Sequence, residues 1–442
     1  MDRKREKHVK EYVANRLFRT KDVAKASFFW NSLSACLSSF QTMVLLLVLT
    51  RLGSDTDAGY LVMAYSVGNI MLNIGKFGMR QYQVTDAKEV YSFGEYVRSR
   101  VVSLSLMAAA LVLYLVWAGA ANGYTPQKIA VVGMICCLKG IEAAEDVLHG
   151  RMQQLGRLDV AGKILSIRFG VYIAGFILLY VLTRNLILTT ALSLVLTLLL
   201  CVLLNGAVIR RFTPEKRESV SRFPSGLLLQ CLPLCVSMVL NIYLGNAPKY
   251  VIDGIVTDEV QTCFNIVFMP ALVVALLAGF VFSPILRKIG TLWTEGRIAE
   301  LRKLALKLTL VPIAIDAVVV AGGYFFGLPV LGFIYGVDVS AYRGVLVVAL
   351  LASGVMAMLN LYADLLTAMR RQRHLFLAYG AGSAVMAFFG RSVLRSAGLE
   401  PMCWMYLGVM ALVVLYCMMI YRITVGKAGT AVPALTETEP GK

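Results

Sequence analysis

Charged residues, histidines and paired cysteine motifs are scarce in this sequence. Asp, Glu, Lys and Arg make up only 16% of its 442 residues, whereas 58% are hydrophobic and the mean hydropathy is +0.71. This composition excludes an ordinary soluble domain. The three histidines (His8, His149 and His374) are far apart, and the nine cysteines lie in apolar runs without a CxxC motif. We therefore predict no metal site and no cofactor, and we assign the cysteines to packing.

Apolar runs of membrane-spanning length dominate what is present. About 20 helical residues are needed to cross roughly 30 Å of hydrocarbon. Twelve such runs lie at 27–49, 59–79, 101–120, 127–148, 161–181, 186–208, 225–244, 262–284, 304–326, 345–367, 375–390 and 402–421. The sequence therefore predicts an all-α polytopic membrane protein with twelve transmembrane helices.

The basic residues are distributed unevenly among the connections between these runs. If the amino terminus is inside, 34 of the 43 Lys and Arg residues fall in inside segments, seven fall outside and two lie within helices. An excess of Lys and Arg keeps short loops in the cytoplasm, so both termini are predicted to be cytoplasmic. Membrane topology thus accounts for the net charge of +17, and we do not predict a nucleic-acid partner.

The longest polar break in the middle of the chain follows the sixth helix and predicts two lobes. We expect a basic cytoplasmic segment at 1–25, an N-lobe at 26–209, a cytoplasmic linker at 210–224, a C-lobe at 225–421 and a cytoplasmic tail at 422–442. The fourth helix ends in Asp146-Val147-Leu148-His149 and the tenth in Asp364-Leu365-Leu366-Thr367. Because both halves have the same orientation, this similarity indicates a parallel pseudo-two-fold repeat.

A stripe of polar residues follows the second predicted helix. Its members are separated by three or four positions, which places them on one helical face: Ser66, Asn69, Asn73, Lys76, Arg80 and Gln83. A polar stripe that ends in two cations is costly in lipid, so we expect it to border a wet cavity suited to an anion. The alternative is that Lys76 and Arg80 reach the headgroups from the end of the helix.

Two further helices carry polar residues at helical spacing. Asn31 and Gln41 belong to such a stripe on the first helix, and Asn241 lies on a polar face of the seventh. We favour a cavity wall for these residues; ordinary helix packing through small polar side chains is the alternative.

Ionisable residues within the fourth and tenth helices form a separate group. Lys139, Glu142 and Asp146 follow one another at helical spacing, and Asp364 is seven residues from Arg371. Such groups neutralise one another at depth. We expect ion pairs that lock helices together, with a proton or ion relay as the alternative.

Several loose motifs carry a family resemblance. They are Arg51-Leu52-Gly53 through Tyr60, Gly75-Lys76-Phe77-Gly78-Met79-Arg80-Gln81, Gly140-Ile141-Glu142 through Gly150-Arg151, and Asn246-Ala247-Pro248-Lys249-Tyr250. In these motifs the sequence resembles the Wzx-like polysaccharide flippases of the multidrug/oligosaccharidyl-lipid/polysaccharide exporter superfamily. The likeness covers essentially the whole chain in helix count and repeat.

The resemblance implies a fold and a substrate. It implies two six-helix lobes that form a V around a cavity, lined chiefly by the first, second, seventh and eighth helices. It also implies that a polyprenyl-pyrophosphate-linked oligosaccharide is moved from the inner to the outer leaflet of the bacterial cytoplasmic membrane by alternating access. In that case Lys76 and Arg80, helped by Arg168, attract the pyrophosphate, and the sugars meet the polar residues Asn31, Gln41, Asn69, Asn73 and Asn241. The implied partners are membrane lipids and the glycosyltransferases and polymerase of a polysaccharide pathway.

Two other functions are compatible with a chain of this class. A drug or cation antiporter on the same scaffold would need deep carboxylates, for which Asp316 and Asp364 are candidates. A membrane-embedded polysaccharide polymerase would need a large outward loop or a clustered acid/base set, and neither is found in the sequence. We therefore predict a transporter that is not an enzyme.

Overall fold

The computed structural model describes most of the chain. The described residues are 11–85, 91–212, 225–271, 295–369 and 371–431, with isolated positions between 274 and 293. Residues 1–10 of the predicted amino-terminal segment, 213–224 of the linker and 432–442 of the tail lie outside them, as does much of the eighth predicted helix at 262–284.

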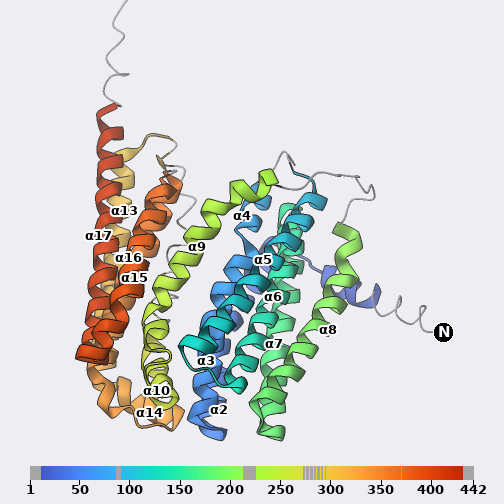
Figure 1. Cartoon of the computed structure of the whole chain (residues 1–442). Coiled ribbons are helices and arrows are strands. Elements are labelled where there is room, and N and C mark those ends of the chain that lie inside the picture. The colour runs from blue at the N-terminus through green and yellow to red at the C-terminus, as the bar shows by residue number, and fades with distance from the viewer. Residues whose placement is uncertain are drawn as a thin grey trace, which may run out of the picture. The chain divides into compact units, whose positions relative to one another are not determined.

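The described residues form helices and no strand, which confirms the all-α prediction. They divide into two compact units, Met1–Val239 and Leu240–Lys442. The first unit contains a short helical segment at 11–18 followed by α2 (Val23–Leu52), α3 (Asp55–Lys76), α4 (Met79–Thr85), α5 (Phe93–Ala121), α6 (Pro126–Gln154), α7 (Leu158–Thr183) and α8 (Leu186–Phe212). In Figure 1 the long helices of this unit run alongside one another as a bundle.

The boundary between the units lies inside α9 (Ser225–Ile252). The remainder of the second unit comprises α10 (Asp258–Phe268), α13 (Ile298–Gly322), a π-helical turn η1 (Gly323–Gly327), α14 (Leu328–Tyr335), a 3-10 turn η2 (Ser340–Tyr342), α15 (Arg343–Ala368), α16 (Gln372–Ala397) and α17 (Leu399–Ala431). The first half of α9 belongs to the first unit because Leu227, Cys231 and Cys235 pack in one core cluster with Phe77 and Met79.

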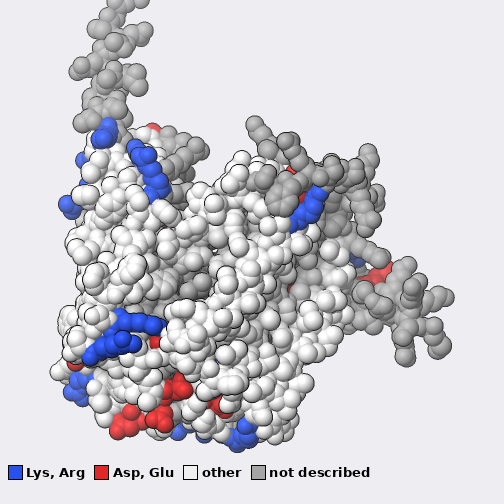
Figure 2. Space-filling view, viewed as in Figure 1, with Lys and Arg blue, Asp and Glu red and all other residues white. Residues whose placement is uncertain are grey.

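Nine helices in the described part of the chain are long and apolar enough to cross a membrane. The helices α3 and α6, with 22 and 29 residues, are also long enough but are more polar. The predicted count of twelve is therefore not reproduced in full, although the polytopic membrane class is. In Figure 2 the Lys, Arg, Asp and Glu residues lie mainly toward the top and the bottom of the view, and the surface at intermediate height is largely free of them.

Local capping signals determine where several helices begin. Ser54 and Thr125 cap α3 and α6 by accepting hydrogen bonds from backbone amides of the first turn, and Pro126 follows directly at the start of α6. Ser92 and Glu95 form a reciprocal capping box at the start of α5. This box starts α5 at Phe93, eight residues before the helix predicted at 101–120.

The polar stripe predicted for a single helix is divided between two. Phe77 and Gly78 have positive φ angles of 52° and 67°, so α3 ends at Lys76 and α4 begins at Met79. A left-handed residue ends a helix because the backbone turns away from the helical path. Arg80 and Gln83 are thus on α4, and the prediction of one continuous helical face was wrong at this point.

One helix occupies the centre of each unit. In the first unit α6 contacts α3, α4, α5, α7 and α8, and in the second α15 contacts α10, α13, α16 and α17. These central helices contain the matched segments of the predicted repeat, ending near Asp146 and Asp364. The last helix extends past the predicted end at Tyr421. Within this extension Val425 is buried, and its carbonyl accepts a hydrogen bond from Arg302.

Candidate functional site

Three acidic residues lie together near the end of α6. Glu142, Glu145 and Asp146 are all buried. Moving a carboxylate out of water costs several kcal/mol unless a cation and hydrogen bonds compensate for the lost hydration. Each of the three is accordingly found next to at least one basic side chain, contributed by α6 itself or by a neighbouring helix.

Glu142 is held between two lysines. Lys76 Nζ on α3 donates to Glu142 Oε1 at 3.0 Å, and Lys139 Nζ, one turn earlier on α6, donates to Glu142 Oε2 at 3.2 Å. The Lys139 ammonium also lies over the ring of Tyr65, 5.5 Å from its centroid, and Tyr65 OH is 2.6 Å from Tyr172 OH. The carboxylate of Glu142 therefore links α3 to α6.

Asp146 accepts from two arginines. Arg100 Nη2 on α5 is 2.9 Å from Asp146 Oδ2, and Arg80 Nη1 on α4 is 3.4 Å from Asp146 Oδ1. Arg100 also donates to the carbonyl of Gly75, which accepts a second hydrogen bond from Ser103. That carbonyl lies in the last turn of α3, where the helix supplies no partner of its own. Arg100 thus stabilises the break between α3 and α4.

Glu145 has its partners on α7 and α8. Its Oε1 lies 2.7 Å from Nε of Arg168 on α7, and its Oε2 accepts from Asn205 Nδ2 on α8 at 3.1 Å. The guanidinium of Arg168 stacks 4.4 Å from the ring centroid of Phe169. This pair connects α6 to α7 and α8.

We call this whole set the ionic network. Its members are Lys76, Arg80, Arg100, Lys139, Glu142, Glu145, Asp146 and Arg168. Five cations face three carboxylates, which leaves a formal charge of +2. Positive charge is accessible mainly at two positions, since the side chains of Lys76 and Arg80 are 31% and 28% exposed whereas those of Arg100, Lys139 and Arg168 are at most 3% exposed. The network can therefore attract an anion at Lys76 and Arg80.

Arg80 has a further polar contact that holds its guanidinium in place. Its Nε and Nη2 both donate to Gln153 Oε1 at the end of α6, at 3.1 and 2.9 Å. Two contacts to one oxygen fix the plane of the guanidinium, while Nη1 reaches Asp146. A positioned, partly exposed arginine is suited to a phosphate oxygen.

Two of the polar residues predicted to line a cavity form hydrogen bonds to backbone carbonyls of the helices. Asn31 Nδ2 donates to the carbonyls of Ser27 and Leu158, so its amide joins α2 to the start of α7. Asn73 Nδ2 donates to the Asn69 carbonyl one turn earlier on α3. The amide of Asn31 therefore bonds both within α2 and to α7, whereas that of Asn73 bonds within α3.

Gln41 and Asn241 retain unused acceptors. Gln41 is 2% exposed, and within the described residues its Oε1 has no hydrogen-bond partner. Oδ1 of Asn241, which belongs to the second unit, likewise has no hydrogen-bond partner among the described residues.

Asp364 is also in the second unit and forms no ion pair with Arg371 or with any other described residue.

Sequence reasoning did not assign Arg100 to the site. The predicted helix began at residue 101 and left Arg100 outside it, yet Arg100 is 2% exposed within α5. The Ser92 and Glu95 capping box was a signal that would have moved the start of the helix and placed Arg100 within it. Gln153 and Asn205 were missed as well, and for them the sequence holds no comparable signal because their partners are distant in the chain.

Comparisons with known proteins give one sequence relative of interest. The chain matches no protein-family model. The capsular polysaccharide biosynthesis protein CapF of Staphylococcus aureus is 23% identical over 324 residues, which cover 71% of this chain and 77% of that protein.

Solved structures resemble the chain along most of its length. A mutant of the Vibrio cholerae MATE transporter VcmN aligns with a TM-score of 0.64 at 12% identity, covering 95% of this chain and 98% of that one. An inward-facing multidrug resistance MATE family transporter of the MOP superfamily gives 0.62 at 12%, covering 89% and 96%. A MOP superfamily transporter from Pyrococcus furiosus gives 0.59 at 15%, covering 94% and 98%. At such identities the likeness concerns the fold alone. The chain therefore has the fold of the multidrug/oligosaccharidyl-lipid/polysaccharide exporter (MOP) superfamily, as its sequence resemblance predicted.

Proposed function

We propose that this protein is a flippase that moves a polyprenyl-pyrophosphate-linked oligosaccharide from the inner to the outer leaflet by alternating access, for surface polysaccharide export. The observation that carries the proposal is the surplus positive charge of the ionic network, which is accessible at Lys76 and Arg80. A pyrophosphate is the anionic part of such a substrate, and the similarity to a capsular polysaccharide biosynthesis protein favours a glycan pathway.

In this proposal Lys76 and Arg80 bind the pyrophosphate, and each cation has a partner within the protein when no substrate is bound. Each cation has a carboxylate partner at rest, Glu142 for Lys76 and Asp146 for Arg80. Those carboxylates keep a second cation each, Lys139 and Arg100, when the first turns to the substrate. Exchange of partners therefore avoids the large cost of an isolated charge at depth. The polar residues Asn31, Gln41, Asn69, Asn73 and Asn241 are the proposed contacts for sugar hydroxyls.

The proposed setting is the bacterial cytoplasmic membrane with both termini in the cytoplasm. The charge asymmetry of the connections supports this orientation. Glycosyltransferases that complete the lipid-linked oligosaccharide and a polymerase that consumes it are the proposed pathway partners.

The proposal is tested by measuring export in three variants: Lys76→Gln, Arg80→Gln and the double variant. We expect each single change to lower the rate of lipid-linked precursor transfer about tenfold, since a hydrogen bond to a charged group contributes about 1.5–3 kcal/mol. Precursor accumulates on the inner leaflet and surface polysaccharide falls. Lys303→Gln, an exposed lysine of α13, is the matched control and leaves transfer unchanged. Normal export by the double variant, at equal protein level, would contradict the proposal.

A drug or cation antiporter is the second candidate, because the solved relatives include MATE transporters. Two carboxylates of the second unit, Asp316 and Asp364, form no ion pair within the described part of the chain. Asp316 lines a mostly apolar cavity of about 750 Å³, and intramembrane carboxylates without cations are typical of ion and proton sites. Loss of drug resistance in Asp316→Asn or Asp364→Asn, with export intact, would favour this candidate. A membrane-embedded polymerase is not favoured, since the solved relatives above are transporters.

A further inference from the structure

The amino-terminal helical segment at 11–18 lies across the ends of α7 and α8. Its inner residues Ala14 and Leu17 are buried, at 3% and 4% exposure, in a core cluster that includes Ile164 and Leu204. Elsewhere the segment carries exposed polar residues, among them Glu11, Asn15 and Arg16. The segment is therefore amphipathic and is held to the bundle by its apolar face.

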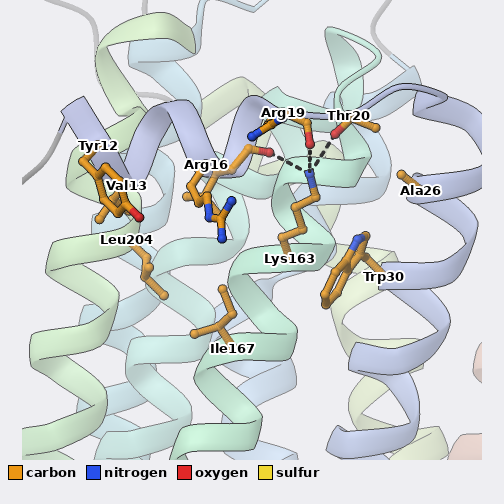
Figure 3. Close-up of a pocket in the computed structure, with 11 residues that line it drawn as sticks. Tyr12, Val13, Arg16, Arg19, Thr20, Ala26, Trp30, Lys163, Ile167 and Leu204 are labelled. Carbon is orange, nitrogen blue, oxygen red and sulfur yellow. Dashed lines mark hydrogen bonds between the residues drawn. The ribbon is translucent and has the colours of Figure 1, made fainter.

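Lys163 on α7 fastens the end of this segment. Its ammonium donates to the carbonyls of Leu17 and Arg19 at 2.8 and 3.3 Å and to Thr20 Oγ1 at 2.7 Å (Figure 3). An ammonium has three donors, so all of them are used here. Lys163 therefore acts as a positioning residue and has no donor left for a ligand.

A cavity of about 670 Å³ lies between this segment and the helices α2, α7 and α8. Ile167 and Leu204 provide apolar walls, and Trp30 stands at its edge (Figure 3). Arg16 directs its guanidinium into the cavity in this view, and Arg19 lies at the rim. Both arginines are exposed, and neither side chain forms a hydrogen bond or ion pair with any described residue.

The accessible charge of this cavity is positive. The described residues that line the cavity include no carboxylate. Asp159, 3.9 Å from the Lys163 ammonium, is fully buried and paired with Arg157 at 2.9 Å. The ammonium of Lys163 contributes further positive potential without being exposed as a donor. A volume of several hundred Å³ with apolar walls and few polar groups is the usual form of a small-molecule site.

We propose that this cavity binds an anionic phospholipid, with the headgroup phosphate at Arg16 and Arg19 and an acyl chain along Ile167 and Leu204. Basic pockets between transmembrane helices on the cytoplasmic side recognise acidic headgroups, and a tryptophan at the edge suits the membrane interface. The assignment to the inner leaflet rests on the proposed orientation. The occupant is a resident membrane lipid, distinct from the transported substrate at Lys76 and Arg80.

Quenching of Trp30 by brominated lipid tests this proposal. The protein is reduced to one tryptophan by replacing Trp117, Trp293 and Trp404 with Phe, and is reconstituted in phosphatidylcholine vesicles. Brominated phosphatidylglycerol and brominated phosphatidylcholine are then compared as quenchers. We expect preferential quenching by phosphatidylglycerol, with the relative binding constant falling about fivefold for each of Arg16→Gln and Arg19→Gln.

A matched control removes two cations elsewhere. Lys303 and Lys307 on α13 are exposed and four residues apart, so Lys303→Gln/Lys307→Gln changes the net charge equally and is expected to retain the preference. Ala26→Phe, which places a ring in the cavity and retains both arginines, is expected to weaken quenching by phosphatidylglycerol. Equal quenching by the two lipids, or a preference that survives Arg16→Gln/Arg19→Gln, overturns the proposal. Release of the brominated lipid by stoichiometric polyprenyl diphosphate also overturns it, since the cavity would then be a substrate site.

Discussion

Glu142 shows how far single residues can be interpreted from the sequence. Its pairing with Lys139 follows from a spacing of three on one helix, and the structure places those groups 3.2 Å apart. Its pairing with Lys76 joins residues 66 positions apart and depends on the packing of α3 against α6. Asp146 was grouped with Lys139 by spacing, yet its partners are Arg80 and Arg100. Helical periodicity identifies neighbours on one helix but not the side chains of the next helix.

Removing the charge of Glu142 is predicted to destabilise the protein. Glu142→Gln leaves Lys139 buried and Lys76 partly buried without their carboxylate, and breaking a buried ion pair in this way costs about 3–5 kcal/mol. We expect a lower unfolding temperature in detergent, measured by intrinsic fluorescence. Glu300→Gln, which breaks an exposed pair with Arg297, is the control and is expected to leave that temperature unchanged. Equal unfolding temperatures for the two variants would show that the ionic network does not stabilise the fold.

At the scale of elements, helix ends were the least accurately predicted features. The start of α5 was misplaced although Ser92 and Glu95 carry a recognisable capping signal. The break at Phe77 and Gly78 lies inside a stripe of polar residues whose helical spacing continues on both sides. Gly78 was the only local indication of the break. Tertiary contacts stabilise that break, because Arg100 and Ser103 satisfy the Gly75 carbonyl.

The break between α3 and α4 is predicted to require glycine at position 78. Gly78 has a φ of +67°, and an added Cβ would lie 2.9 Å from Leu234 Cδ2. Gly78→Ala is therefore expected to cost at least about 1–2 kcal/mol and to lower transport by displacing Arg80. Gly170→Ala within α7 is the control, since its Cβ would meet nothing within 4 Å. The measurements are the unfolding temperature and precursor transfer; wild-type values for Gly78→Ala would contradict this role.

The docking of segment 11–18 is predicted to depend on Lys163. Lys163→Met removes the donors to Leu17, Arg19 and Thr20 while retaining the apolar length of the side chain. We expect faster trypsin cleavage after Arg19, because the segment separates more often from the bundle. Lys163→Arg is the comparison that retains charge. Unchanged cleavage in Lys163→Met would mean that Ala14 and Leu17 suffice to hold the segment.

At the scale of the whole molecule, orientation in the membrane is the prediction most directly open to test. Alkaline phosphatase is active only outside the cytoplasm, so a fusion after Gly123, between α5 and α6, is expected to be active. A fusion after Gly156, between α6 and α7, is expected to be inactive. The reverse pattern would place the termini outside and would remove the assignment of the cavity beside Trp30 to the inner leaflet.

The sequence by itself determined the membrane class, the all-helical fold and most helix locations, because length, apolarity and backbone hydrogen bonding in lipid allow few alternatives. Its loose motifs also indicated the superfamily whose fold the chain adopts. Only the tertiary structure decided which charges meet. Arg100, Arg168 and Asn205 reach α6 from three other helices, and a burial cost of several kcal/mol per ion is offset only where such distant partners converge.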